Sequence, residues 1–225
     1  MKLAAHGAQT LGQRVRQEDG FALVQLPGEA LLAVVADGLG GHPAGDLASR
    51  IAIEGIADFA RRDFARLHQA PPAALQDVAQ AIDDALVDIS SRHPPLAGMA
   101  TTLSALYFTP ERVFRLSIGD SLIHRLHGRS CARWNELHEG EDGFLTSCLG
   151  GNLRHIDCPP RGAAVKAGDR FLIASDGIEV LDAKAVCRLL RAGETPQQCV
   201  QSVLDAIDAV GFEHQDNSTV IAVFA

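Results

Sequence analysis

The sequence predicts an α+β protein in which stacked β-sheets are covered by helices. Three observations indicate this: short apolar runs of strand length recur, a long helical stretch separates the second run from the third, and another helix lies near the C-terminus. The order strand, strand, helix, helix, strand, strand differs from the alternating pattern of parallel sheets. No repeat or Pro/Gly/Ser-rich linker divides the 225 residues, so we expect one domain over 1–225.

The predicted strands are short runs rich in Val, Ile, Leu and Phe. Several are almost wholly apolar, which is typical of strands that are buried on both faces. The runs cover 21–26, 31–36, 102–108, 113–118, 171–174 and 219–224. We therefore expect them to form the inner layers of the fold.

The predicted helices are marked by apolar spacing and by start signals. Residues 44–66 carry apolar side chains at roughly helical spacing, the proline pair 71–72 then breaks the chain, and a second helix covers 73–91. A late helix has Thr195 as its N-cap and Pro196 at its first position, with a glutamine placed to complete a capping box. These helices are expected to cover the sheets.

The composition excludes several classes of protein. The chain has 28 Asp and Glu against 20 Lys and Arg, a net charge of -8 and a mean hydropathy of +0.06, which argues against disorder and against binding to nucleic acid or anionic membranes. No apolar stretch approaches the about 20 residues that span a bilayer, and the start lacks the apolar region of a signal peptide. We expect a cytoplasmic monomer without nucleic-acid or membrane partners.

The five cysteines are odd in number and include no Cys-x-x-Cys pair. They are Cys131, Cys148, Cys158, Cys187 and Cys199. This pattern suits neither a disulfide framework nor a zinc site, so most of them are expected to be buried, reduced thiols. Any metal should then be bound by oxygen.

Acidic residues stand at the ends of the predicted strands. Asp37, Asp120 and Asp176 each follow one, and Glu18, Asp19 and Asp216 precede two others. A single Asp-Gly pair is ordinary turn chemistry, but the one at 37–38 opens a glycine-rich loop that leads into a helix. Clustered carboxylates repel one another unless cations neutralise them, and oxygen ligands select hard cations such as Mg²⁺ or Mn²⁺.

Seven short motifs occur in an order that resembles the metal-dependent PP2C-type protein phosphatases, in a compact bacterial form. They are residues 13–19, 35–42, 98–102, 118–121, 149–151, 174–177 and 216–219. The resemblance implies a four-layer αββα sandwich of two antiparallel sheets flanked by helices. It also implies hydrolysis of phosphoserine and phosphothreonine by a water or hydroxide that bridges two Mn²⁺ or Mg²⁺ ions.

The resemblance also implies roles for individual residues. The metal ligands by position are Asp37, the Gly38 carbonyl, Asp176 and Asp216, with Glu18 and Asp19 acting mostly through coordinated water and Asp120 matching the ligand of a third ion. Arg14 matches the arginine that grips the substrate phosphate, for which its planar fork of donors is suited. Arg14, Asp19 and Asp37 are thus the catalytic candidates. The implied partners are phosphoprotein substrates, including a Ser/Thr kinase or its targets.

The chain departs from the family pattern at Gln17, Leu39 and Leu122 and in the segment 134–145. Leu39 stands where many eukaryotic members have a histidine that is the proposed general acid, which leaves His42 as a candidate proton donor beside coordinated water. The segment 134–145 is shorter than the one that usually carries a flap over the active site. Substrate selection and third-metal behaviour are therefore open at this point.

Two other functions remain as alternatives. The chain could be a catalytically weak pseudophosphatase that acts as a binding or regulatory module. Cys148 and Arg154 fit the C-x₅-R pattern of cysteine-dependent tyrosine phosphatases, although the usual histidine before the cysteine is absent. His124 and His127 are expected to be surface histidines rather than a metal pair, because residues three apart on a strand point to opposite faces.

Overall fold

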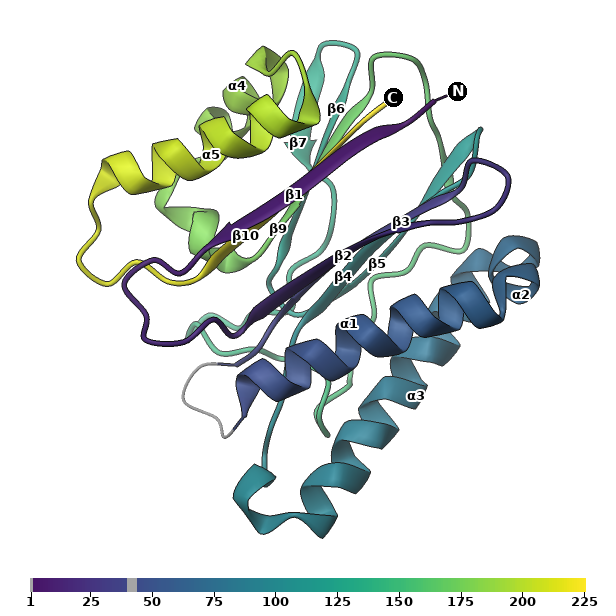
Figure 1. Cartoon of the computed structure of the whole chain (residues 1–225), viewed down its shortest axis with the longest axis vertical. Coiled ribbons are helices and arrows are strands. Elements are labelled where there is room, and N and C mark those ends of the chain that lie inside the picture. Colours follow the sequence, from purple (N-terminus) through teal and green to yellow (C-terminus); the bar gives the residue numbers. More distant parts are fainter. Residues whose placement is uncertain (1, 40–43) are drawn as a thin grey trace.

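Two five-stranded antiparallel sheets lie face to face in the computed structural model, which describes residues 2–39 and 44–225. The first sheet consists, in spatial order, of β1 (Ala4–Thr10), β10 (Ser218–Phe224), β9 (Arg170–Ala174), β6 (Leu122–His127) and β7 (Ser130–Arg133). The second consists of β2 (Asp19–Gln25), β3 (Leu31–Asp37), β4 (Leu103–Phe108), β5 (Arg112–Ile118) and β8 (Ala163–Ala164). Figure 1 shows the two sheets between two layers of helices, which confirms the predicted αββα sandwich.

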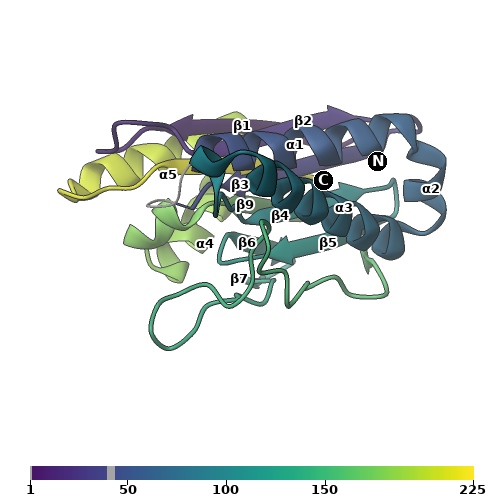
Figure 2. The ribbon, with the colours of Figure 1, turned by 90° about the horizontal axis from the view of Figure 1, so that it is seen from below.

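The helices cover the outer faces of the two sheets. The second sheet carries α1 (Gly45–Arg62), α2 (Phe64–Gln69) and α3 (Pro71–Arg92), and the first carries α4 (Ala183–Ala192) and α5 (Pro196–Val210). Two 3₁₀ helices, η1 (Pro94–Leu96) and η2 (Asp176–Val180), lie in connections. Seen from below, α1 and α3 lie across the second sheet (Figure 2). No helix of the described residues combines the length and the apolarity needed to cross a membrane.

The apolar strands are buried on both faces, as predicted. In β3, Leu32 and Val34 pack toward the helical layer of α1 and α3, whereas Leu31 and Val35 pack into the space between the sheets. Phe108 and Phe171 meet edge to face in that space, with ring centroids 5.1 Å apart. The alternation of side chains along a strand thus supplies two apolar layers from a single run.

The six predicted strands are present, but the sequence reading missed four. These are β1, β6, β7 and β8, which carry mixed polar and apolar residues or are very short. The predicted helix 44–66 is interrupted at Asp63, where α1 ends and α2 begins. The proline pair 71–72 does not break the chain but starts α3, because proline lacks only an N–H that the first helical turn leaves free.

The late helix begins as predicted, and a further helix was not predicted. The Oγ1 atom of Thr195 accepts a hydrogen bond from the Gln198 N–H at 3.2 Å, while the Gln198 side chain accepts from the Glu194 N–H rather than that of Thr195. The missed helix α4 begins at Ala183, with the Asp182 side chain accepting from the Ala185 N–H at 2.7 Å. This cap is an ordinary start signal that the reading overlooked.

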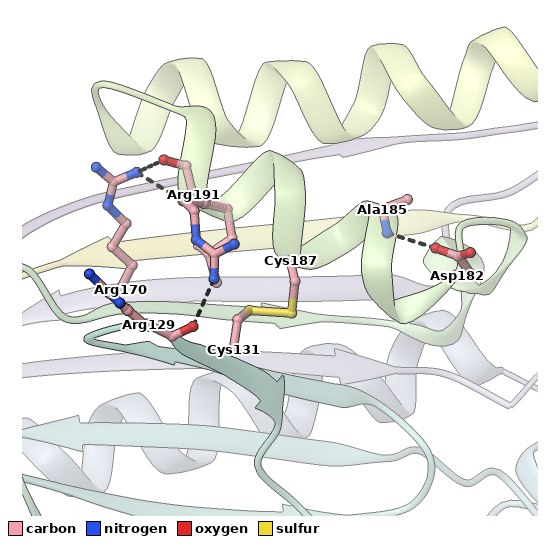
Figure 3. The surroundings of a disulfide bond; sticks show 8 residues. Arg129, Cys131, Arg170, Asp182, Ala185, Cys187 and Arg191 are labelled. Atoms are coloured by element: carbon pink, nitrogen blue, oxygen red, sulfur yellow. Dashed lines mark hydrogen bonds between the residues drawn. A yellow bond between two sulfur atoms is a disulfide. The ribbon is translucent and has the colours of Figure 1, made fainter.

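Two of the five cysteines form a disulfide bond, which the sequence did not predict, and the other three are free. Cys131 on β7 is bonded to Cys187 on α4 (Figure 3). The two residues are 56 positions apart in sequence, and only the packing of α4 against the edge of the sheet brings their Cα atoms to 5.7 Å. Cys148 and Cys199 are buried and free, as expected, and Cys158 is free and partly buried.

One of the two predicted surface histidines is buried. His124 is 2% exposed and neither ring nitrogen has a hydrogen-bond partner, so burial lowers its pKa to about 4. His127, on the opposite face of β6, remains partly exposed, and its Nδ1 lies 2.6 Å from Asp169 Oδ1. The prediction of opposite faces is confirmed, and the prediction of exposure is wrong for His124.

Candidate metal and phosphate site

The antiparallel register brings the acidic strand ends to one end of the sandwich. Asp19, at the start of β2, lies directly opposite Asp37, at the end of β3. In the other sheet the end of β9 pairs with the start of β10, which places Asp176 near Asp216. Asp120 follows β5, two strands from β3 in the same sheet. Carboxylates from both sheets therefore converge.

These side chains line a depression of about 350 Å³. Its lining consists of Arg14, Glu18, Asp37, Gly38, Leu39, Asp120, Asp176, Asp216 and Asn217. Asp19 lies against this group, is 7% exposed, and is close enough for its charge to act on Asp37. The structure thus gathers the predicted site residues that it describes, whereas His42 lies outside the described residues.

The carboxyl groups of the site resist ionisation. Burial raises the pKa of Asp37 well above its ordinary value, and the charges of Asp19, Asp176 and Asp120 raise it further. Burial also raises the pKa of Asp19 to about 6 and that of Asp120 to about 7, the latter with help from the charge of Asp176. Without a cation these groups favour their protonated forms at a higher pH than an ordinary aspartate does.

Two buried carboxylate oxygens find no hydrogen-bond partner among the described residues, and a cation could interact with both. They are Oδ1 of Asp19 and Oδ1 of Asp176. The other oxygen of Asp19 accepts a hydrogen bond from Ser175 Oγ at 2.7 Å. Unpaired buried oxygens in a group of mutually repelling carboxylates suit a hard divalent cation.

The carboxylates do not form a closed cage. Within residues 2–39 and 44–225, no three His, Cys, Asp or Glu side chains are already arranged as a metal-binding group. A cation held here would therefore be coordinated partly by water, as is usual for Mg²⁺ bound by few carboxylates. An open site of this kind leaves positions for a substrate.

Arg14 is a cation that faces the carboxylates. Its Nη2 donates to Asp216 Oδ2 at 2.5 Å, and the Arg14 side chain is 49% exposed. An exposed ion pair of this kind is worth about 0–1 kcal/mol, so the guanidinium can exchange its partner at little cost. Arg14 is thus placed to bind an anion that enters the depression.

Close backbone contacts position the two Asp-Gly pairs. A Cβ on Gly38 would lie 2.2 Å from the carbonyl oxygen of Gly45, and one on Gly177 would lie 1.9 Å from that of Asn217. A side chain fits at neither position. The Asp37 carbonyl accepts hydrogen bonds from the Thr102 N–H and from Thr101 Oγ1, both at 2.8 Å. The glycines therefore allow neighbouring segments to approach and fix the aspartates that precede them.

Several supporting residues received no role in the sequence analysis. Asn217 accepts from the Glu18 N–H at 2.8 Å and donates to the Leu11 carbonyl at 2.9 Å, so it ties the Arg14 loop to the start of β10. Ser175 holds Asp19. Both residues lie within the seven motifs, next to the aspartates, and this position could have predicted their supporting role. Glu179, whose charge acts on Asp120, had no such signal.

The short segment after β7 is attached next to Asp120. The His138 N–H donates to the Gly119 carbonyl at 2.9 Å, and the Gly119 N–H donates to His138 Nδ1 at 3.2 Å. Glu139 lies close enough for its charge to raise the pKa of Asp120. Figure 2 shows the chain after β7 as a loop standing out from the sandwich. This loop borders the site without the length of a large flap.

A larger cleft lies away from the carboxylates. It measures about 1150 Å³ and lies at the junction of α2 and α3, where four prolines contribute to its lining. It contains Glu111 as its sole acidic lining residue. Volume alone therefore does not identify the reactive site, because the converging carboxylates are found in the smaller depression.

Comparison with known families bears on this geometry. A family model described as Protein phosphatase 2C matches residues 6–217, which spans every acidic strand end of the site. The chain belongs to the protein phosphatase 2C family. The resemblance inferred from the seven motifs is thereby confirmed.

Relatives found by sequence similarity are serine/threonine phosphatases. The chain is 31% identical over 231 residues to the serine/threonine phosphatase stp of Listeria innocua, covering 93% of this chain and 90% of that protein. It is 26% identical over 217 residues to the serine/threonine protein phosphatase PstP of Mycobacterium tuberculosis, covering 85% of this chain but 40% of that protein. It is 30% identical over 126 residues to the serine/threonine phosphatase stp of a Listeria monocytogenes strain, covering 56% of this chain and 50% of that protein.

Solved structures share the fold. The serine/threonine phosphatase Stp1 from Staphylococcus aureus superposes with a TM-score of 0.88 at 20% identity, covering 100% of this chain and 97% of that one. The catalytic domain of PstP, solved in complex with two manganese ions, gives a TM-score of 0.82 at 24% identity, covering 99% and 97%. At this identity the likeness establishes the αββα architecture.

Proposed function

We propose that this chain is a metal-dependent phosphatase that hydrolyses phosphoserine and phosphothreonine monoesters in proteins. The observation that carries the proposal is the convergence of buried, unpaired aspartate oxygens beside an exposed arginine in one depression. The family match and the serine/threonine phosphatases among its relatives support the reaction class. The two manganese ions of the PstP structure support the metal class.

The carboxylates have the donor chemistry for two Mn²⁺ or Mg²⁺ ions. Asp37 would be shared between the ions, with the Gly38 carbonyl on one side and Asp176 and Asp216 on the other. Glu18 and Asp19 would act mostly through coordinated water. Two such ions would supply a bridging water of lowered pKa as the nucleophile and would neutralise charge on the phosphoryl oxygens. The aspartates would be ionised when they hold the cations, because a carboxylate ligand must be deprotonated.

Arg14 would position the substrate. Its guanidinium presents parallel N–H donors that match two oxygens of a phosphate monoester. In the structure one of these donors, on Nη2, is engaged by Asp216 Oδ2. If Asp216 held a cation, Arg14 would be free to bind the phosphate, and metal binding would then favour substrate binding. Phosphoryl transfer depends largely on such positioning and charge stabilisation.

Finer features of the proposal rest on the same residues. Asp120 is the ligand proposed for a third ion, because it borders the depression and is surrounded by acidic groups. Coordinated water is the preferred proton donor to the leaving group, with His42 as the alternative. The substrates would be phosphoproteins made by a Ser/Thr kinase, including the kinase itself or its targets. The proposed setting is a monomer in the cytoplasm.

The structure favours neither alternative function. Cys148 is 6% exposed, and burial raises the pKa of its thiol, whereas a catalytic cysteine needs a lowered pKa. The carboxylates Asp83 and Asp120 raise it further. A pseudophosphatase would be expected to have lost part of the site, yet Arg14 and four of the aspartates line one depression, and Asp19 lies opposite Asp37.

The proposal is tested by phosphate release from matched phosphopeptides. EDTA-treated protein should be inactive, and Mn²⁺ should restore hydrolysis of phosphoserine and phosphothreonine peptides in preference to a phosphotyrosine peptide of the same sequence. Asp37→Asn and Asp216→Asn should each lower kcat/KM by at least about 100-fold, because each removes a charged metal ligand.

A matched control separates ligand loss from general damage. Asp84→Asn changes an exposed aspartate on α3 and should leave hydrolysis unchanged. Full activity in either ligand variant, or activity that survives EDTA, would contradict the metal assignment. Loss of activity on treatment with iodoacetamide alone would instead support the Cys148 alternative.

A further inference from the structure

A basic cleft lies beside the disulfide bond, between β7 and α4. It measures about 680 Å³ and is lined by Arg129, Ser130, Cys131, Lys184, Cys187, Arg188, Arg191 and Ala192. Four lining residues are cationic and none is acidic, in a chain whose net charge is -8. The two segments that form it, 128–133 and 183–193, contain no Asp or Glu. The cleft is therefore a local positive region on an acidic protein.

The cations of the cleft are not neutralised by nearby carboxylates. Within the described residues, Arg129, Lys184, Arg188 and Arg191 form no ion pair. Arg191 instead donates to the carbonyl of Arg129 at 3.1 Å, as Figure 3 shows. Two acidic residues flank the segment 183–193 in sequence: Asp182, whose side chain caps the start of α4, and Glu194. Their charge is thus available to an anionic ligand.

The disulfide bond forms part of the wall of this cleft. Cys131 and Cys187 both line it, and both are partly buried rather than fully enclosed. The bond joins the edge strand β7 to α4 (Figure 3). Beside clustered Arg and Lys, a cysteine released from the bond is stabilised as a thiolate, which makes it a better leaving group.

We infer that this cleft is a thiol–disulfide exchange site for small anionic thiols. Its volume falls within the range of about 300–1,000 Å³ that is typical of small-molecule sites. Its charge suits a thiol that carries carboxylates. A docked acidic peptide would account for the cations alone, whereas an anionic thiol accounts for the cations and for the disulfide that they surround.

The disulfide is reduced in two successive thiol–disulfide exchange steps. The thiolate of the first small molecule attacks one sulfur of the Cys131–Cys187 bond, which breaks and leaves its electron pair on the other cysteine as a thiolate. A second small thiolate attacks the mixed disulfide and displaces the remaining cysteine thiolate. The two cysteines are reduced by two electrons and take up protons, and the two small thiols are oxidised to one disulfide.

Exchange at this position should not unfold the protein. Val186 and Leu190 of α4 are buried in the same apolar cluster as α5, so the helix stays packed when its covalent link is lost. The cleft also lies at the turn between β6 and β7, whereas Asp120 lies before the other end of β6. The rate of exchange can therefore be measured independently of phosphate hydrolysis.

The test compares thiols of different charge on the air-oxidised, full-length chain. Glutathione as the anionic probe, 2-mercaptoethanol as the neutral one and cysteamine as the cationic one are applied at equal thiolate concentration, and reduction of Cys131 and Cys187 is followed by alkylation and peptide mass spectrometry. At low salt, glutathione should react at least about threefold faster than cysteamine, and high salt should remove the difference.

Variants of the cleft provide the second arm of the test. Arg188→Gln or Arg129→Gln should slow glutathione at least about threefold and leave cysteamine unchanged or faster. The matched control is Arg92→Gln, an exposed arginine on α3 that pairs with Asp88. Equal rates for the three thiols, unchanged rates in both cleft variants, or free Cys131 and Cys187 in the air-oxidised protein would overturn the inference. None of these outcomes depends on phosphatase activity.

Discussion

At the scale of single residues, the aspartates of the site lie in an environment that disfavours their ionised form. Burial and mutual repulsion raise the pKa values of Asp19, Asp37 and Asp120. Two of the buried oxygens, on Asp19 and Asp176, receive no hydrogen bond from residues 2–39 and 44–225. Such an arrangement destabilises the metal-free fold at neutral pH and is relieved when a cation binds.

These raised pKa values predict a pH-dependent stabilisation by Mn²⁺. An acid with a raised pKa in the folded state binds more protons there than in the unfolded chain, so its contribution to stability is lost as pH rises through the folded value, about 6 for Asp19 and about 7 for Asp120. Thermal unfolding should therefore show a larger Mn²⁺-induced rise in Tm at about pH 8 than at about pH 5, where protons compete with the metal.

The comparison is made with and without Mn²⁺ at each pH, because other groups also titrate. His124, whose pKa is lowered to about 4, destabilises the fold as pH falls below its ordinary value, and it does so with or without the metal. An Mn²⁺-induced shift that is equal at the two pH values, or larger at the lower one, would contradict the role of these carboxylates.

Arg14 gives a second prediction at this scale. Arg14→Ala should lower kcat/KM for a phosphopeptide at least about tenfold, because the bidentate contact to the phosphate is lost. Affinity for Mn²⁺ should be kept, since the variant removes a competitor for Asp216. Arg16→Ala, two residues along the same exposed loop, is the matched control. Loss of Mn²⁺ binding without a loss of phosphate recognition would assign Arg14 a structural role instead.

At the scale of elements, helix α3 holds the loop that contains Gly150 and Gly151. The Oδ1 atom of Asp83, which is 7% exposed, accepts hydrogen bonds from the N–H groups of both glycines, at 2.7 and 2.9 Å. The neighbouring residue, Leu149, forms bridges with Thr101, which in turn donates to the Asp37 carbonyl. A chain of contacts thus runs from α3 to the metal-site aspartate.

This contact predicts a loss of stability in Asp83→Ala. Two charge-assisted hydrogen bonds to partly buried backbone N–H groups are lost, which should lower the free energy of unfolding by about 2–3 kcal/mol and the Tm by several degrees. The measurement is thermal unfolding beside Asp84→Ala, its exposed neighbour on α3. A Tm of Asp83→Ala equal to that of the control would show that the contact contributes little.

The elements differ in how far the sequence could predict them. The strands β3, β4 and β10 were predicted because continuous apolar runs admit burial on both faces. In contrast, β1 and β6 carry glycine, histidine or arginine among apolar residues, and their pairing with distant strands decides their conformation. The proline pair at the start of α3 shows that one residue type signals either a break or a beginning.

At the scale of the whole molecule, the site exists only because the sheets assemble in one register. The sequence could predict that aspartates stand at strand ends, and the family resemblance of the ordered motifs predicted which of them lie in one site. It could not predict the Cys131–Cys187 bond, since the partners lie 56 positions apart and an odd number of cysteines favoured free thiols. Contacts of long sequence separation depend on packing that local patterns do not encode.

The charged residues of the molecule are unevenly distributed over its surface. Part of the net charge of -8 is concentrated at one end of the sandwich, where two divalent ions would neutralise half of the net value. The basic cleft beside α4 is the opposite case, with four cations gathered in an acidic chain. The two regions give the protein separate places for cations and for anions.

The central claim is that the converging aspartates are a divalent metal site, and calorimetric titration of Mn²⁺ into EDTA-treated protein tests it most directly. The wild-type chain should bind two ions, the number present in the PstP structure, and Asp37→Asn should lose most of this binding while Asp84→Asn retains it. Absence of Mn²⁺ binding in the wild type, or equal binding in Asp37→Asn, would contradict the account.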